Sequence, residues 1–211
     1  AHGNKYSLAH HLLYPEAAVI DPTLIVGAPR SLTLATGLDS LSHALESLWN
    51  VNATPISATF AVEAAREIME TLPRLLDNLG DVELRSRQAR ASLLAGFAFS
   101  QTKTALAHNI SYDITLKSGL VHGIACSFSL PIVMGWAAGN DAACDAALRR
   151  IFGADLNEGA RKLRAFLESV GVKTDPAAYG VSPGEWTRLV EKALQGERGK
   201  NFIGRLTVKA A

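Results

Sequence analysis

The sequence predicts an all-α fold, a helical bundle built around one apolar core. Three observations indicate this class. The chain has 211 residues, of which 48% are hydrophobic but only 7% aromatic, and it is rich in Ala and Leu, a mixture typical of packed helices. Apolar residues recur at helical spacing, as at Leu38, Leu41 and Leu45. No region is rich in the alternating pattern of strands.

The chain is expected to divide into an irregular lead-in, residues 1–32, and an all-α metal-binding domain, residues 33–211. Three prolines in the lead-in oppose helix formation, so residues 17–20 and 24–26 are predicted to be short extended pieces. Helical periodicity then begins, with Thr36 as the expected N-cap of the first helix.

The second and third helices carry clear start signals. Thr54 is a suitable cap, and Pro55 occupies the first helical position, where its missing N–H costs nothing. This helix is predicted to run toward Leu79, bent or broken near Pro73. Asp81 then caps a long Ala-rich helix.

The second half of the chain consists of shorter helical segments. They are expected at residues 108–116, 122–136, 141–152 and 156–170, the second of them interrupted by Pro131. Gly171 is a good helix terminator, and Ser182 begins a Ser-Pro-x-Glu signal for the last helix. The tail, residues 197–211, is basic and irregular.

Charge and composition indicate which classes of binding partner are not expected. The net charge of +1 provides no strong field toward nucleic acid or anionic membrane, so neither is expected as a partner. The longest mostly apolar stretch, residues 124–138, falls short of the roughly 20 residues of a membrane span. Cys126 and Cys144 offer at most one disulfide, which favours a reducing cytoplasm. The chain begins at Ala1 without methionine, and we expect it to be a piece of a longer protein.

Two histidine-containing patterns are candidates for chemistry. Asp39 and His43 lie four residues apart, so they project from one face of the predicted helix and can share a divalent metal. The alternative is that Asp39 belongs to a capping-box variant begun by Thr36.

His108 and His122 each begin a helical stretch among small apolar residues. Burying an imidazole there is costly without a partner. A shared metal would be such a partner, and three imidazoles with one carboxylate suit Fe(II), Zn(II) or Ni(II) better than Mg(II) or Ca(II). The alternative is two core histidines, each bonded to a backbone carbonyl.

Several segments together resemble one enzyme family. Residues 36–46 (TGLDSLSHALE) resemble the TGxDAxxHAxE signature of the iron-containing, group III, alcohol dehydrogenases, and residues 15–24 (PEAAVIDPTL) resemble the stretch that precedes it. Residues 94–99 (LAGFAF) resemble a further helix of that family. Residues 121–123 (VHG) resemble its PHG ligand motif, with Val in place of Pro.

The resemblance implies a fold, a site and a reaction. Asp39, His43, His108 and His122 become the metal ligands, with Fe(II) or sometimes Zn(II) polarising an alcohol or aldehyde oxygen while NAD or NADP exchanges hydride. The dinucleotide is bound mainly by an α/β domain that precedes the helical one in the family, and residues 1–211 contain no glycine-rich GxGxxG signature. Family members are commonly dimers or larger.

One departure points to a branch of the family. Many members have a histidine four residues after the third ligand, where this chain has Tyr112 as a candidate catalytic residue, whose ordinary pKa of about 10 makes it a poor base. Residues 107–117, 122–131 and 198–204 resemble the phosphonoacetaldehyde reductase-type branch. A phosphonate needs cationic partners. The candidates are Lys103, Lys117, Arg198 and Lys200.

Two other functions remain as alternatives. One is a metal-dependent non-redox enzyme on the related fold, similar to dehydroquinate synthase, although its ligand pattern differs. The other is a stand-alone helical domain that serves in binding or oligomerisation.

Overall fold

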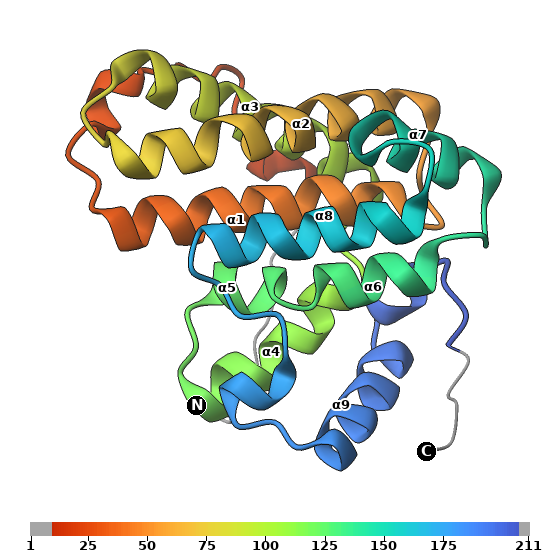
Figure 1. The fold of residues 1–211 in the computed structure, drawn as a ribbon. Helices are drawn as coiled ribbons and strands as arrows, with labels where there is room; N and C mark the ends of the chain where they lie inside the picture. Colours follow the sequence, from red (N-terminus) through yellow and green to blue (C-terminus); the bar gives the residue numbers. More distant parts are fainter. Residues whose placement is uncertain (1–9, 207–211) are drawn as a thin grey trace.

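A computed structural model describes residues 10–206 of the chain. Nine α-helices are described within that range, and the expected all-α class is confirmed (Figure 1). They are α1 (Arg30–Leu48), α2 (Pro55–Asp77), α3 (Val82–Thr102), α4 (Leu106–Ser118), α5 (His122–Ser127), α6 (Leu130–Ala137), α7 (Ala142–Phe152), α8 (Leu156–Ser169) and α9 (Pro183–Gln195). Short 3₁₀ turns occur at η1 (His11–Leu13), η2 (Pro22–Ile25), η3 (Pro176–Tyr179) and η4 (Gly199–Asn201).

Helix α1 is the central element of the bundle. It packs against α2 and α3 on one side and against α5 on the other, as Figure 1 shows. Its apolar stripe, Leu38, Leu41 and Leu45, is completely buried. Helix α1 is therefore enclosed on both sides, and polar side chains on its side toward α4 and α5 are held inside the molecule.

Close backbone contact brings α5 onto α1. Gly123 lies so near Ala35 that a Cβ at this glycine would overlap the Ala35 carbonyl oxygen. The absence of a side chain at Gly123 thus permits the approach of the two helices. This approach sets the position along α1 that the neighbouring His122 faces.

Most helix starts follow the predicted capping chemistry. Thr54 and Ser57 form a reciprocal capping box at α2, and the side chains of Asp81 and Ser182 accept hydrogen bonds at the starts of α3 and α9. Gly171 adopts a positive φ of 91° after α8, as expected for a helix terminator.

Two local expectations about the beginning of the chain are wrong, and a third is wrong in part. Helix α1 begins at Arg30 after Pro29, and Thr36 lies inside it with its hydroxyl bonded to the Leu32 carbonyl, 2.9 Å away. The piece expected to be extended at residues 24–26 overlaps the 3₁₀ turn η2, because Asp21 caps that turn by accepting from Thr23. Helix α2, expected to be bent or broken near Pro73, is not broken there: it continues through Pro73 to Asp77, although the proline removes one backbone donor.

Burial explains why α2 tolerates its internal proline. Leu72, Leu75 and Leu76 around it are at most 5% exposed. The packing of these side chains holds the last turn of the helix in place. The segment at residues 122–136, expected to be interrupted by Pro131, is divided into α5 and α6, with Pro131 in the first turn of α6.

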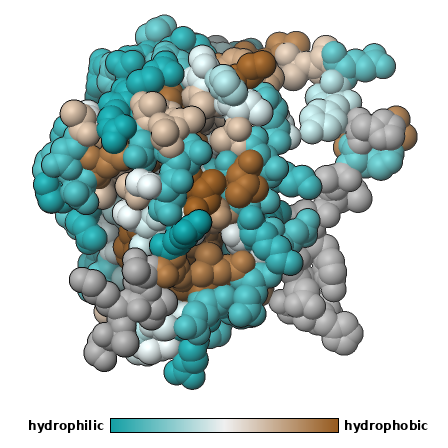
Figure 2. Space-filling view, turned by 90° about the vertical axis from the view of Figure 1, so that its right-hand side faces the viewer, coloured by the Kyte–Doolittle hydropathy of each residue, from teal (hydrophilic) through white to brown (hydrophobic). Residues whose placement is uncertain are grey.

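The surface is mixed in character. On the face shown in Figure 2, hydrophobic side chains gather in a central area that is surrounded by hydrophilic ones. None of the helices among residues 10–206 is long and apolar enough to cross a membrane.

Candidate metal centre

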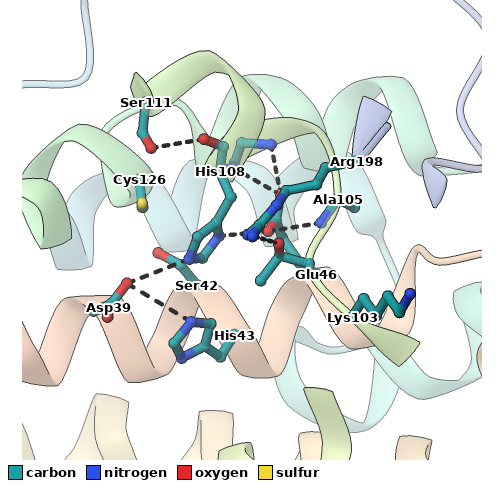
Figure 3. Close-up of polar contacts among 12 residues, drawn as sticks. Asp39, Ser42, His43, Glu46, Lys103, Ala105, His108, Ser111, Cys126 and Arg198 are labelled. Carbon is teal, nitrogen blue, oxygen red and sulfur yellow. Dashed lines mark hydrogen bonds and ion pairs between the residues drawn. The ribbon is translucent and has the colours of Figure 1, made fainter. Parts of the chain in front are cut away.

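Three helices contribute to one cluster of polar side chains. Asp39, His43 and Glu46 lie on one face of α1, at spacings of four and three residues, so they point the same way. His108 comes from the first turn of α4 and His122 from the first residue of α5. Figure 3 shows Asp39 and His43 below the His108 ring and Glu46 beside it, with Asp39 and His108 directed toward each other.

The sequence-predicted ligands surround one carboxylate oxygen. Asp39 Oδ1 lies 3.4 Å from His108 Nε2, 3.8 Å from His122 Nε2 and 3.9 Å from His43 Nε2. The His108 side chain is only 2% exposed, whereas those of Asp39, His43 and His122 are 29%, 21% and 33% exposed. The cluster is thus buried at His108 and open toward Asp39 and His122.

His43 holds a different orientation from the other two imidazoles. Its ring stacks between Phe99, at a centroid distance of 4.2 Å, and His108, at 4.7 Å. The rings of His108 and His122 instead meet edge to face, with an interplanar angle of 73°. His43 therefore forms a wall of the cluster in this structure.

A fourth donor enters the cluster from α5. Donor atoms of Asp39, His108, His122 and Cys126 all lie within 4.8 Å of one another. Cys126 is completely buried, and its Sγ is 3.5 Å from His122 Nε2. Sequence reasoning gave Cys126 no role, although the four-residue spacing from His122 on a helix was a usable signal.

Glu46 was also given no role, although it ends the signature at residues 36–46. It is fully buried and accepts hydrogen bonds from the backbone N–H groups of Ala105, Ala107 and His108. Its Oε2 lies 2.6 Å from His108 Nδ1. The carboxylate thus fixes both the start of α4 and the ring of His108. A carboxylate behind an imidazole is the usual support of a metal-bound histidine, because it directs the other nitrogen toward the ion.

The electrostatics keep the two carboxylates charged. Burial raises the pKa of Glu46, but the charge and hydrogen bond of His108 outweigh burial and leave that pKa below its ordinary value. The pKa of Asp39 is likewise lowered, since His108, His43 and His122 offset the cost of burial. Burial opposes protonation of His108, yet Glu46 raises its pKa well above 6.5. Burial and the neighbouring His108 lower the pKa of His43 to about 4.

Two buried atoms at the centre of the cluster have no hydrogen-bond partner. They are Asp39 Oδ1 and His108 Nε2, which face each other without the geometry of a hydrogen bond. Leaving buried polar atoms unsatisfied costs about 1–3 kcal/mol each, so such pairs call for an explanation. A divalent ion bound by both atoms would satisfy them, and the O, N and S donors around them suit a first-row transition metal. The residues of the cluster therefore fit a metal.

Tyr112 and Arg198 lie beside the cluster. The Tyr112 ring is half-buried and stacks nearly parallel to His122, at a centroid distance of 6.2 Å and an interplanar angle of 8°. Burial raises the pKa of Tyr112 above its ordinary value. The Arg198 guanidinium lies 5.2 Å from the centre of the Tyr112 ring and bonds to Thr104 Oγ1 at 2.6 Å.

The three candidate lysines lie in other surroundings. Lys117 is exposed and bonds to Glu185 at 2.9 Å, between α4 and α9. Lys103 is exposed at the end of α3, and Figure 3 shows its side chain turned away from His108. Lys200 is exposed in η4. Among the four cations proposed for a substrate anion, only Arg198 has a described contact with a residue that stacks on the cluster.

The sequence is similar to that of one known protein family. Residues 33–206 match the family model described as Fe-containing alcohol dehydrogenase family, C-terminal. The NAD-dependent methanol dehydrogenase of Bacillus methanolicus is 41% identical over 129 residues, which is 61% of this chain and 34% of that protein. The phosphonoacetaldehyde reductase of Streptomyces viridochromogenes is 37% identical over 130 residues, covering 61% of this chain and 33% of the relative.

A solved structure extends the likeness over most of the chain. The sulfoacetaldehyde reductase of Bifidobacterium kashiwanohense, determined in complex with NAD+, superimposes with a TM-score of 0.83 at 26% identity, over 92% of this chain and 52% of the other. The chain thus spans about half the length of that protein, and its matches cover about one third of the length of the two relatives. The family match over residues 33–206 and the convergence of Asp39, His108 and His122 lead to one conclusion: the chain belongs to the iron-containing alcohol dehydrogenase family, as part of its C-terminal helical region.

Proposed function

We propose that this chain is the metal-binding catalytic half of an NAD- or NADP-dependent alcohol dehydrogenase or aldehyde reductase. The observation that carries the proposal is the convergence of Asp39, His108 and His122, in which Asp39 Oδ1 and His108 Nε2 are buried without a hydrogen-bond partner. These three side chains, with His43 as the predicted fourth ligand, would hold Fe(II) or Zn(II). A domain that precedes the helical region would bind most of the dinucleotide, and we infer from the family that the protein acts as a dimer or larger assembly.

The bound metal would supply Lewis acidity toward the alcohol or aldehyde oxygen while the nicotinamide exchanges hydride with the carbon. The chain's own residues prepare this chemistry. Glu46 holds the Nδ1 side of His108, so Nε2 is directed at Asp39, and Nε2 would bind the metal once it has lost its proton. We infer that the hydroxyl of Tyr112, whose ring stacks on His122, donates a hydrogen bond to a reacting oxygen; burial raises its pKa and keeps it protonated at neutral pH.

We propose a small aldehyde with an anionic group, such as phosphonoacetaldehyde, as the preferred substrate. Arg198 supports this choice, because its guanidinium lies over the ring of Tyr112, which stacks on His122. A planar guanidinium carries five N–H donors in a fork that matches phosphonate oxygens. Two of the relatives are named for phosphonoacetaldehyde and sulfoacetaldehyde, both small anionic aldehydes.

The loop that carries Arg198 is well anchored. Asn201 donates from its side-chain amide to the Thr104 carbonyl, and the backbone N–H of Val51 donates to the Asn201 carbonyl at 2.8 Å. Gly199 lies so close to Ala193 that no larger residue fits without movement. A cation on such a loop loses little entropy when it binds an anion.

Metal content and activity test the proposal together. The intact protein should bind one Fe(II) or Zn(II) per subunit and reduce phosphonoacetaldehyde with a nicotinamide cofactor. Asp39→Asn and His108→Ala should lose both metal and activity, whereas the surface change Lys117→Ala should keep both. Stoichiometric metal without any hydride transfer, over a panel of charged and neutral aldehydes, would favour a non-redox or purely binding role instead.

Two further expectations complete the proposal. Cys126 and Cys144 are both free, which fits a reducing compartment, and we infer a cytoplasmic location. For the anionic substrate, equal kcat/KM for phosphonoacetaldehyde and a neutral aldehyde of similar size would contradict the assignment.

A further inference from the structure

We propose that a cavity between α1, α3 and the lead-in is a docking site for the domain that precedes the helical region, and that it receives apolar side chains and one amide group of that domain. This inference rests on the proposed function, because the preceding domain is part of that proposal. Helix α1 lines the cavity with Thr36 and Ser40 and also carries Asp39 and His43 of the metal centre. Docking at this place therefore fixes the position of the dinucleotide-binding domain relative to the metal centre.

The cavity has a volume of about 520 Å³ and is lined mostly by apolar residues. The lead-in contributes Ile20, Ile25 and Ala28, and α3 contributes Leu93 and Gly96. A Cβ at Gly96 would meet none of the described residues within 4 Å, so the open space reaches the backbone of α3. Packed interiors contain few voids larger than a water molecule, so a space of this size between apolar side chains calls for an occupant.

One polar side chain of the cavity wall has no partner. Gln88 is only 9% exposed, and neither its Nε2 nor its Oε1 has a hydrogen-bond partner among the described residues. Other polar groups of the wall are satisfied, since Ser40 Oγ lies 2.7 Å from Ser92 Oγ and the Thr36 hydroxyl donates to the Leu32 carbonyl. A buried amide is costly while it is unpaired, and an occupant with one donor and one acceptor satisfies it. A peptide group or a carboxamide offers both, which favours a polypeptide as the occupant.

Arg85 fixes the lead-in to the rim of the cavity. Its side chain is 2% exposed, and its guanidinium donates to the carbonyls of Ala28 and Leu79, each at 3.0 Å, and to Thr33 Oγ1 at 2.8 Å. The bond to Ala28 holds the end of the lead-in against α3. A domain that precedes the lead-in is therefore attached beside the cavity, and a short connection gives it a high effective concentration there. A second copy of the chain has no such attachment.

The apolar residues of the cavity wall are incompletely covered. Ile20, Ile25, Leu32 and Leu93 all line the cavity, and they are still between 38% and 51% exposed. Apolar surface that is gathered in this way and left exposed usually marks an interface. The chain covers 52% of the sulfoacetaldehyde reductase, so the other half of a protein of that size is large enough to cover this surface.

Filling the cavity from within tests the inference. In the intact protein, Gly96→Leu places a side chain in the space that the preceding domain enters. Backbone amides of residues 17–25 should then exchange hydrogen for deuterium at least about 10-fold faster than in wild type, because an overpacked interface loses at least about 1.4 kcal/mol of stability. Metal content and helix content by circular dichroism should stay unchanged, which shows that the helical region remains folded.

Gly135 provides the matched control. It lies on α6, outside the cavity, and its Cβ position also has open space around it. Gly135→Leu should leave the exchange of residues 17–25 unchanged. Equal acceleration in the two variants, or no acceleration in Gly96→Leu, would overturn the inference.

A crystal structure of the intact wild-type protein gives a second measurement that does not depend on the folding of a variant. Side chains of the preceding domain should fill the cavity, and one of its polar groups should bond to Gln88. A cavity that holds a second copy, a small molecule or solvent alone would overturn the inference and leave the proposed function in place. Docking without hydride transfer to any aldehyde would overturn the proposed function and keep the inference. An intact protein without a preceding domain would overturn both.

Discussion

Replacement of Glu46 by Gln isolates the contribution of the carboxylate behind His108. The change keeps the size of the side chain but removes its charge and one acceptor oxygen. In the structure Oε1 accepts from the backbone N–H groups of Ala107 and His108, and Oε2 accepts from Ala105 N at 3.0 Å and pairs with His108 Nδ1 at 2.6 Å. A carboxamide can keep one of these two pairs, while its NH₂ group faces the other two donors.

The expected cost follows from the bonds that are lost. Hydrogen bonds to a charged group contribute about 1.5–3 kcal/mol each, so losing two of them lowers the free energy of unfolding by about 3–6 kcal/mol. This is a large part of the roughly 5–15 kcal/mol that stabilises a typical domain. Because Glu46 also fixes the ring of His108, metal affinity should fall by about 10- to 100-fold.

Glu67 offers a control of similar burial. Its side chain is 8% exposed and pairs with Arg87 and Arg90 on α3, away from the metal cluster. Glu67→Gln should lower stability in urea unfolding without changing metal affinity, whereas Glu46→Gln should lower both. If calorimetric titration with Zn(II) gives the same affinity for Glu46→Gln and wild type, Glu46 does not support a metal ligand and the reasoning fails.

Three other predictions concern the same region. In the metal-free protein the pKa of His43 is about 4, below its unfolded value of 6.5. Between these two pH values only the unfolded state binds the proton, so the free energy of unfolding falls as pH decreases, by at most about 3 kcal/mol. His43→Gln should flatten this part of a urea-unfolding pH series, and an unchanged slope would contradict the prediction. Gly123→Ala forces a Cβ against Ala35, so it should lower the free energy of unfolding by about 1–3 kcal/mol or more and also lower the metal content. Gly135 on α6 has open space around it, so Gly135→Ala should change the melting temperature little. Equal effects of the two changes would refute the close-contact argument. Arg198→Met should lower kcat/KM for phosphonoacetaldehyde by at least about 10-fold, the equivalent of one charge-assisted bond, and leave a neutral aldehyde almost unaffected; parallel losses would point to a structural role.

Local sequence signals predicted most of the helices because their causes are local. Capping by Thr54, Asp81 and Ser182 depends on residues within one turn, and all three caps are present. The start of α1 was misplaced because Thr36 has the right chemistry for a cap, but Pro29 already provides the break and residues 30–35 continue the helix. Pro73 was expected to bend or break α2, and its tolerance depends on tertiary packing, which no local pattern reveals.

The residues of the candidate site likewise fall into two groups: those that the sequence predicted and those whose roles depend on tertiary contacts. The spacing of Asp39 and His43 on one helix face was readable, and the resemblance joined His108 and His122 to them. The positions of Glu46 and Cys126 depend on contacts between helices: Glu46 meets the start of α4 about sixty residues later in the chain, and Cys126 reaches the cluster only because Gly123 allows α5 to approach α1. Of the four cations considered for a substrate anion, charge alone could not rank Arg198 above the lysines.

The position of the metal tests the central claim most directly. Crystals of the intact, metal-loaded protein should show a single anomalous-scattering peak at the absorption edge of the bound ion, within bonding distance of Asp39, His108 and His122. A stoichiometric ion bound elsewhere in the protein, with these three side chains unliganded, would contradict the account.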